Sequence, residues 1–492
     1  MIIKKRIQIT VLIILFTLSA VSMCQAKGKR KKTSLKKQAL SHIDEMKDTL
    51  NQTAKQIWDF AELAMGEYKS AELLAKLLED RGFKVERGVA SVPTAFVATF
   101  GNGHPVIGIL GEFDALPGLS QKAGVPEKQA LEQGAPGHGC GHNLFGVAGA
   151  GAVIAAKEVM EKYNIKGTLK FFGCPAEETV EGKIYMARDG VFDGLDICLD
   201  WHPASKNQVS LGTSNALNNF EVTFHGHTAH AAGDPWNGRS ALDAVELMNH
   251  GINYLREHVK PTVRIHYVIP EAGMAPNVVP DYARGWYYVR GKDRPEVEDV
   301  YARVLKIAEG AALMTGTKHE VRVNTGVYNY LKNRQVAKLL YKNLQWVGAP
   351  RFSEEEQNYA KKMQTFLGRK ETGMSTVIEP FKEPEGYWGG GSTDAADISW
   401  LVPTASLNTA CVPLDIPGHS WCVVSAVGSS VGYKGMQAAA KVLSAAAVEV
   451  LSNPAVVKRA QAEFKEKTKG FVYKSAIPKG QKPRMKDRES KN

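Results

Sequence analysis

The chain has 492 residues, of which 44% are hydrophobic and 23% charged, so we expect a globular protein with more than one hydrophobic core and two domains. The formal net charge of +11 lies at the two ends, because residues 1–38 and 456–492 together carry +18 and the rest of the chain about −7. A body of that charge argues against nucleic-acid binding in a groove, and the basic ends allow at most peripheral contact with a membrane.

The N-terminus has the three parts of a secretory signal peptide. A basic start precedes an apolar run over residues 7–23 and a cleavage site at Cys24-Gln25-Ala26. The run is almost long enough to span a membrane, so an uncleaved anchor is one alternative, and a lipoprotein at Cys24 is a weaker one because Met23 is bulky. We expect residues 1–26 to be the signal peptide of a periplasmic or secreted protein. The remaining five cysteines are widely spaced, which argues against a disulfide framework.

Helix and strand patterns alternate in the first part of the mature chain. Helices are expected over residues 35–65, 70–81 and 146–162 and near Ile184, and strands over residues 95–100, 106–111, 168–174 and 195–200. This alternation predicts an α/β fold in which a mostly parallel sheet is flanked by helices. Functional side chains are then expected at the carboxyl ends of the strands.

The pattern changes between residues 216 and 329, where a small α+β domain is expected. Strand, helix, strand, strand, helix and strand patterns cover residues 220–224, 239–259, 264–268, 284–290, 295–314 and 319–323. This order is the split βαβ pattern. We therefore expect an inserted domain over residues 216–329, a catalytic domain made of residues 27–215 and 330–455, and a basic, only partly ordered tail over residues 456–492. The second catalytic segment should contain a strand at 405–407 and a helix at 432–451.

Residues 137–143 read Gly-His-Gly-Cys-Gly-His-Asn and have the composition of a metal-binding loop. Cys140 and His142 are two residues apart, so in an extended segment their side chains leave the same side and could reach one metal ion. The glycines would let the backbone approach that ion closely. The alternative is a buried thiol beside a loop that caps a helix.

Acidic and imidazole side chains in further loops extend this candidate site. Glu177 and Glu178 follow a buried strand, and both can face one site only if the chain bends, as it would near Pro175. One carboxylate would then bind metal and the other would handle a proton, whereas the alternative is an acidic helix N-terminus. His202 and His419 occupy comparable positions, although a lone histidine is more often structural.

Five of these side chains are the predicted metal ligands: Cys140, His142, Glu178, His202 and His419. A catalytic zinc usually has three protein ligands and a water, so five ligands indicate two metal ions that share a water. Manganese, zinc and cobalt all suit a mixed set of thiolate, imidazole and carboxylate. The predicted reaction is hydrolysis of an amide.

Several motifs resemble those of the metal-dependent aminoacylase and carboxypeptidase family of amidohydrolases. They are Glu112-Phe113-Asp114-Ala115-Leu116-Pro117, the run at 137–143, Pro175-Ala176-Glu177-Glu178, the runs at 238–244 and 275–280, and Gly391-Ser392-Thr393-Asp394. The resemblance covers residues 40–455 and is to the branch that includes auxin-conjugate, hippurate and aminobenzoyl-glutamate hydrolases, in particular to the B-subunit type of the last. It implies a di-metal exopeptidase fold with an inserted lid and dimerisation domain.

The resemblance also implies roles for single residues. The five ligands would bind two divalent metal ions, Glu177 would act as general base and later as acid, and Asp114 would orient the site from behind the ligands. His230 and Asn277 would bind the substrate's carboxylate or the oxyanion from the partner subunit of a homodimer, and Arg290 would clamp a carboxylate. For the last three, the alternatives are a helix cap, a turn residue and a surface charge.

The predicted function is hydrolysis of the amide in an N-acyl or N-aroyl amino acid such as aminobenzoyl-glutamate, with Glu177 as base on a metal-bound water. A dipeptidase or peptide deacylase on the same metal centre is one alternative, and a non-catalytic envelope-associated binding protein is another. A cytoplasmic enzyme of this branch would not be expected to have an export signal, so an extracellular N-acyl amino acid or dipeptide is an alternative substrate. A paralogous A subunit would make the protein a heteromer. His138 matches no ligand position and is expected either to support the ligands from behind or to be structural.

Overall fold

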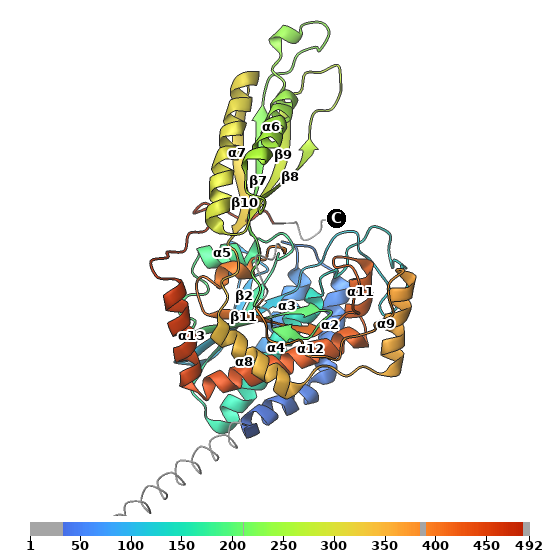
Figure 1. Ribbon diagram of the computed structural model, residues 1–492, viewed down its shortest axis with the longest axis vertical. Helices are drawn as coiled ribbons and strands as arrows, with labels where there is room; N and C mark the ends of the chain where they lie inside the picture. The colour runs from blue at the N-terminus through green and yellow to red at the C-terminus, as the bar shows by residue number, and fades with distance from the viewer. Residues whose placement is uncertain (1–32, 210, 384–389, 486–492) are drawn as a thin grey trace, which may run out of the picture.

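The computed structural model describes residues 33–209, 211–383 and 390–485, so the predicted signal peptide lies outside the described residues. The described chain forms two bodies, a larger one built on a seven-stranded sheet and a smaller one built on a four-stranded sheet. The smaller body stands upright on the larger one (Figure 1). Each body has its own cluster of buried hydrophobic residues.

The larger sheet has the strand order β1-β2-β4-β3-β5-β11-β6. Its strands are β1 (Lys84–Arg87), β2 (Phe96–Asn102), β3 (Val106–Glu112), β4 (Gly167–Cys174), β5 (Ile197–Ala204), β6 (Gln208–Val209) and β11 (Thr404–Ala410). The four central strands β4, β3, β5 and β11 run parallel, and the edge strands pair in antiparallel fashion. The parallel centre, with helices around it, confirms the predicted α/β fold.

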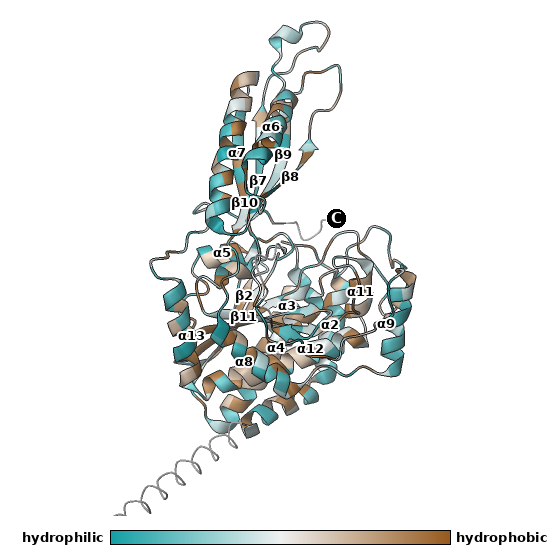
Figure 2. Cartoon of the chain, in the orientation of Figure 1, coloured by the Kyte–Doolittle hydropathy of each residue, from teal (hydrophilic) through white to brown (hydrophobic). Residues whose placement is uncertain are grey.

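Helices surround this sheet (Figure 1). Residues 33–45 are helical, and the other helices are α2 (Lys47–Phe60), α3 (Tyr68–Glu79), α4 (His142–Tyr163), α5 (Gly182–Arg188), α8 (Arg334–Val347), α9 (Glu354–Phe366), α10 (Ala395–Ile398), α11 (Trp421–Val427), α12 (Ser430–Leu451) and α13 (Pro454–Lys467). Hydrophobic residues concentrate in α4, α12 and the central strands, whereas the peripheral α9 and α13 are more hydrophilic (Figure 2). This contrast follows from burial at the centre.

Helix α4 is the core helix that carries the candidate site. It is long and apolar enough to cross a membrane, but 94% of its apolar window is buried inside the protein. Small residues let it lie close to β3, since a Cβ on Gly149 would stand 2.8 Å from the carbonyl oxygen of Leu110. A Cβ on Gly146 would likewise stand 2.9 Å from the carbonyl oxygen of Glu112. This close packing brings the first turn of α4 to the carboxyl end of β3.

The smaller body consists of β7 (Ala216–His225), α6 (Ala241–Leu255), β8 (Arg264–Glu271), β9 (Tyr282–Gly291), α7 (Arg294–Thr315) and β10 (Lys318–Val327). Its sheet has the order β10-β7-β9-β8 and is antiparallel throughout. This order of elements confirms the predicted split βαβ domain inserted into the first. Strands β8 and β10 form its two edges.

The segment after α12 has more structure than the predicted tail. Helix α13 is followed by residues that lie along the junction between the two bodies. The hydroxyl of Tyr473 donates a hydrogen bond of 2.8 Å to Asp397 in the larger body, and Nε2 of Gln481 donates one of 2.7 Å to the carbonyl oxygen of Val323 in β10. These contacts tie the inserted domain to the larger body, and the partial order predicted for residues 456–492 stays a prediction, because residues 486–492 lie outside the described residues.

Candidate active site

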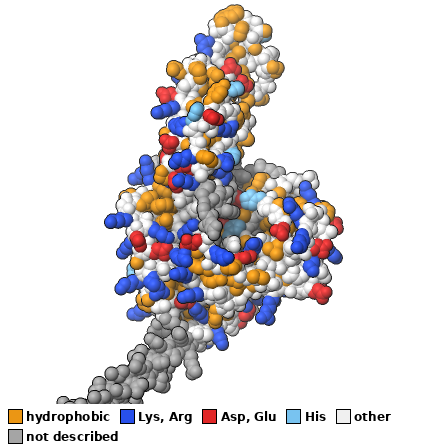
Figure 3. Space-filling model, viewed as in Figure 1, with side chains coloured by type: hydrophobic (Ala, Val, Ile, Leu, Met, Phe, Trp, Pro, Cys, Tyr) orange, Lys and Arg blue, Asp and Glu red, His pale blue; other side chains and the backbone are white. Residues whose placement is uncertain are grey.

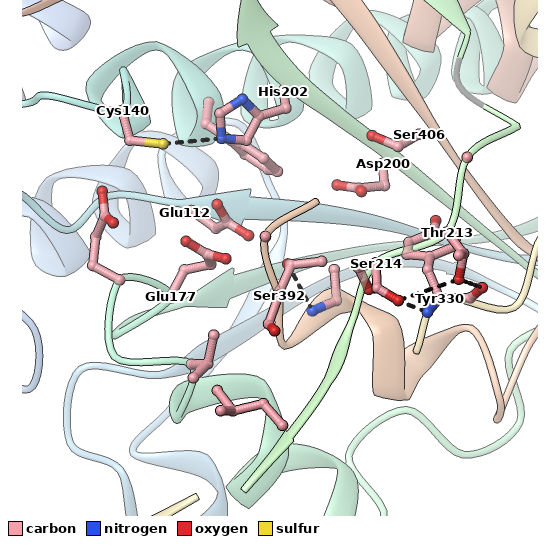
Figure 4. Close-up of a pocket in the computed structure, with 18 of the residues that line it drawn as sticks. Glu112, Cys140, Glu177, Asp200, His202, Thr213, Ser214, Tyr330, Ser392 and Ser406 are labelled. Atoms are coloured by element: carbon pink, nitrogen blue, oxygen red, sulfur yellow. Dashed lines mark hydrogen bonds between the residues drawn. The ribbon is translucent and has the colours of Figure 1, made fainter. Parts of the chain in front are cut away.

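A cavity of about 460 Å³ opens where the ends of β3, β4 and β5 meet the base of the inserted domain. Figure 3 shows histidine side chains in the hollow below that domain. Inside the cavity, Cys140, His202 and Glu177 lie on one side, and Tyr330 lies on the other (Figure 4). Asp200 lies between them (Figure 4). The volume is sufficient for a small organic substrate.

The loop at residues 137–143 is not extended, so that part of the prediction is wrong. Gly141 adopts a left-handed φ of 82°, and α4 begins at the next residue, His142. A side chain at Gly139 would collide with Leu119, because its Cβ would stand 2.5 Å from Cδ1 of that residue. The left-handed turn at Gly141 nevertheless brings Cys140, which precedes the helix, and His142 into one candidate metal group.

The chain bends after β4, as expected near Pro175. Ala176 has a left-handed φ of 56°, a conformation that costs energy for a residue with a Cβ and often occurs at functional sites. Its N–H donates a hydrogen bond of 2.8 Å to Oε1 of Glu67, a fully buried residue that the sequence did not single out. Burial, and then the charge of Asp114, raise the pKa of Glu67 to about 8. Glu67 thereby holds the turn that presents Glu177.

Three groups of side chains could each hold a metal ion, with ligand atoms within 4.8 Å of one another. They are Cys140, His142 and His202; Cys140, Glu178 and His419; and Glu112, His142 and Glu177. All five predicted ligands belong to at least one group, and their role as ligands stays a prediction. His202 lies within β5 and not in the loop after it.

The residues present fit a pair of cations. Nε2 of His142 and Oε2 of Glu112 lie 3.1 Å apart without forming a hydrogen bond, and Oε1 of Glu178 also lacks a hydrogen-bond partner among the described residues. Buried polar atoms without partners are rare in native proteins and often mark the place of an ion or water. Thiolate, imidazole and carboxylate donors together suit a divalent cation.

Asp114 fixes the orientation of His142. Its Oδ1 accepts a hydrogen bond of 2.8 Å from Nδ1 of His142, which leaves Nε2 directed at the carboxylates of Glu112 and Glu177. Its Oδ2 accepts the N–H of Glu178 at 2.9 Å. Burial alone would raise the pKa of Asp114, but the charge of His142 and these hydrogen bonds hold it below its usual value. This contact pattern matches the orienting role that the resemblance implies.

Glu177 points toward the same cluster of ligands. Its Oε2 lies 3.8 Å from Nε2 of His142. Burial, and then the nearby carboxylate of Glu112, raise the pKa of Glu177 well above its usual value. A carboxylate in such surroundings has a strong tendency to take up a proton.

A buried charge bridge behind the site was missed by sequence reasoning. Lys183 is fully buried, and its Nζ lies 2.6 Å from Oε1 of Glu112 and 2.6 Å from Oδ1 of Asp394. Oδ2 of Asp394 also accepts the backbone N–H of Lys183 at 2.9 Å. Glu112 and Asp394 lie in motifs that carry the family resemblance, and their place in these motifs could have marked them as functional residues. A lysine near the start of a short helix usually indicates an exposed face, so nothing pointed to Lys183.

The predicted substrate-binding residues do not all reach the cavity. Arg290 lines it, and its Nη1 donates a hydrogen bond of 3.3 Å to Oγ of Ser392. His230 and Asn277 lie in loops of the inserted domain that take no part in the cavity, and both are exposed. Nδ1 of His230 accepts the N–H of Gly233 at 2.9 Å, a local turn contact. Within one chain, only Arg290 of the three lies at the site.

His138 lies behind the site and has a structural position. It is fully buried, and its Nε2 donates a hydrogen bond of 2.9 Å to the carbonyl oxygen of Ile57 in α2. Burial lowers its pKa to about 4. It belongs to none of the candidate metal groups among the residues that the structure describes.

Known proteins resemble this chain along almost its whole length. The family model of the M20 peptidase dimerisation domain matches residues 214–313. The B subunit of p-aminobenzoyl-glutamate hydrolase from Escherichia coli (strain K12) is 39% identical over 458 residues, which cover 87% of this chain and 95% of that protein. The Xaa-Arg dipeptidase of Mus musculus is 28% identical, covering 88% of this chain and 92% of that protein.

Solved structures share the fold at lower sequence identity. An aminobenzoyl-glutamate utilization protein from Klebsiella pneumoniae superposes with a TM-score of 0.57 and 17% identity, covering 83% of this chain and 97% of that chain. The YXEP protein of Bacillus subtilis, a dinuclear metal-binding peptidase of the M20 family, superposes with a TM-score of 0.54 and 18% identity, covering 83% of this chain and 99% of that chain.

Proposed function

The chain belongs to the M20 peptidase family, and from this premise we propose that it cleaves the amide bond of an N-acyl or N-aroyl amino acid, such as aminobenzoyl-glutamate, with two divalent metal ions. It is a hydrolase of linear amides or peptides, as its relatives are. The observation that carries the proposal is that two candidate metal groups share Cys140, and that their members other than the buried His142 line one cavity with Glu177. The 39% identity to one subunit of an aminobenzoyl-glutamate hydrolase supports this class of substrate.

The roles of the residues follow from their positions. Two cations held by Cys140, His142, Glu178, His202 and His419 would polarise the amide carbonyl and lower the pKa of the attacking water. Glu177 accepts a proton from that water and then delivers it to the leaving nitrogen. Manganese or zinc would suit the donors, and cobalt would also fit.

Arg290 would bind the carboxylate of the substrate's amino acid. It is the single Lys or Arg among the described residues that line the cavity, and Ser392 holds its guanidinium. A guanidinium binds a carboxylate through two parallel hydrogen bonds, which also orients the substrate. His230 and Asn277 would complete the site from the partner subunit of a dimer.

The edge strand β8 is the surface through which we propose that two copies pair. Val268 and Ile269 on this strand are 56% and 40% exposed. An open edge with exposed apolar side chains favours pairing with another strand. The matched dimerisation model covers this strand. A heteromer with a paralogous subunit is the alternative, supported by the subunit names of the relatives in Escherichia coli and Haemophilus influenzae.

The substitution Val268→Arg should convert the dimer into a monomer, because it places a charge at the centre of the proposed contact. Sedimentation velocity of the purified full chain measures the change. Val321→Arg is the matched control, since Val321 is 37% exposed on β10, the opposite edge of the same sheet, and should leave the dimer intact. A Val268→Arg variant that still sediments as a dimer would remove β8 from the interface.

Export is part of the proposal and rests on residues 1–26 alone. Their basic start, apolar run and cleavage site support a periplasmic or secreted enzyme. An extracellular N-acyl amino acid or dipeptide would then reach the site without crossing the inner membrane.

A hydrolysis screen of the purified full chain tests the function. With manganese or zinc added, the protein should release the amino acid from aminobenzoyl-glutamate or other N-acyl amino acids, and metal analysis should find about two cations per chain. Chelation should abolish turnover. Dipeptides in the same screen separate the dipeptidase alternative, which the likeness to Xaa-Arg dipeptidase supports. Absence of both metal and turnover, with and without a paralogous subunit, would favour a binding protein.

A further inference from the structure

Asp200 is a buried carboxylate in the cavity that the proposed mechanism does not use. It lies on β5 with 5% of its surface exposed, and it lines the cavity together with Ser406 and Tyr330 (Figure 4). It belongs to none of the candidate metal groups among the described residues. Its Oδ1 has no hydrogen-bond partner in the described part of the chain, and the buried hydroxyl of Tyr330 has none either. Unpaired buried oxygens of this kind call for a partner that donates hydrogen bonds.

The cations near Asp200 are engaged elsewhere. Nζ of Lys183 lies 2.6 Å from both Glu112 and Asp394 in the charge bridge. Arg290 donates to Ser392. Neither cation forms an ion pair with Asp200. A buried carboxylate without a cationic partner is costly, and a hydrogen-bond donor that arrives with the ligand would lower that cost.

We propose that Asp200, with the hydroxyls of Tyr330 and Ser406, receives an amino group of the substrate. The inference rests on the proposed function, because this amino group is part of the same substrate molecule whose amide bond is cleaved in the cavity. An ammonium group would donate to the Asp200 carboxylate and to both hydroxyl oxygens, whereas an arylamine, which has two N–H bonds, would donate to the carboxylate and to one hydroxyl oxygen. Phe145 and Leu217 also line the cavity and would contact the carbon frame that carries the amine.

The same hydrogen-bond donor could come from two parts of a substrate. An amine on the acyl group, as in an aminobenzoyl group, is one source, and a basic side chain on the released amino acid is the other. Both leave the amino acid's carboxylate for Arg290. The cavity therefore selects a substrate that has a carboxylate for Arg290 and an N–H donor for Asp200.

Matched pairs of substrates test the proposal on the metal-loaded full chain. One pair is N-(4-aminobenzoyl)glutamate and N-(4-methylbenzoyl)glutamate, and the other is N-benzoyl-lysine and N-benzoyl-norleucine, which lacks the terminal amine. In one pair, kcat/KM should be at least about tenfold higher for the amine, as expected for a hydrogen bond to a charged group. The pair that shows the preference identifies the source of the amine. A ratio near one in both pairs would mean that Asp200 holds only water.

Variants assign the preference to Asp200. Asp200→Asn should reduce the ratio to about two or less, and Tyr330→Phe should reduce it by a smaller factor. Ser392→Ala is the control. It removes the hydrogen bond to Arg290, so it should lower kcat/KM by the same factor for both substrates of a pair and leave their ratio unchanged. Since a general loss of folding or metal also lowers both members, the ratio reports the contact alone. If Asp200→Asn does not fold, Tyr330→Phe decides, and an unchanged ratio overturns the proposal.

Product binding separates this inference from the proposed function. Calorimetry on the same protein compares 4-aminobenzoate with 4-methylbenzoate, and lysine with norleucine. Tighter binding of an amine without turnover of any amide would retain the amine site and remove the proposed reaction. Turnover without a preference for the amine in either kinetics or binding would retain the proposed reaction and remove the amine site.

Discussion

Replacing Glu177 with glutamine should lower kcat by a factor of about 10³ or more while the protein remains folded and metal-loaded. Glutamine has the shape of glutamate but cannot accept a proton from water or return it to the leaving nitrogen. The backbone that carries it is fixed independently, because Glu67 binds the N–H of Ala176 and Asp114 binds the N–H of Glu178. The change should therefore appear in kcat with little change in the structure of the loop.

Metal analysis alongside kinetics distinguishes the base from a ligand. Glu177 also belongs to the candidate group with Glu112 and His142, so its carboxylate could hold a cation instead of moving a proton. A base predicts that Glu177→Gln retains its metal, whereas Glu178→Gln, at a predicted ligand, should lose at least part of it. Nearly full turnover in Glu177→Gln would remove the residue from catalysis, and loss of metal would make it a ligand.

The loops of the site could be predicted because each contains a residue type that binds metal ions and can be recognised in the sequence by itself. Cys140, His142 and Glu178 are side-chain types that bind metals, and strand patterns placed them at one edge of a sheet. The backbone conformation of these loops could not be predicted from the sequence. A two-residue spacing brings two side chains together on a strand, whereas such residues point apart within a helix. Here the left-handed φ of 82° at Gly141 turns the chain between Cys140 and the first helical residue, His142, and so brings the two side chains together.

The supporting residues were not predictable because their burial depends on packing between distant segments. Glu67 and Lys183 are polar residues at the starts of helices, a position that is usually exposed. Both are fully buried here, Glu67 against Thr94 before β2 and Ala176 after β4, and Lys183 between Glu112 of β3 and Asp394 before α10. His230 and Asn277 differ in kind, since their predicted partner is another subunit and one chain cannot bring them to the cavity.

The substitution Lys183→Met should lower the free energy of unfolding by about 3–5 kcal/mol, the range found when one partner of a buried ion pair is removed. Methionine fills a similar volume but leaves the carboxylates of Glu112 and Asp394 without a cation in a site where both are almost fully buried. Urea unfolding measures this loss of stability on protein from which metal has been removed with a chelator, because bound metal would add its own stabilisation.

Two further variants decide whether charge is the cause. Lys157→Met is the matched control, since Lys157 is also buried but its partners Glu158 and Glu161 are 36% and 49% exposed, so its loss should cost less than about 1 kcal/mol. Adding Glu112→Gln and Asp394→Asn to Lys183→Met should recover part of the lost stability, because neutral amides need no cation. If Lys183→Met loses less than its control, the bridge is not a source of stability. A loss without recovery in the triple variant would instead assign the cost to packing around the lysine stem, since the charges that the lysine opposes would then be gone.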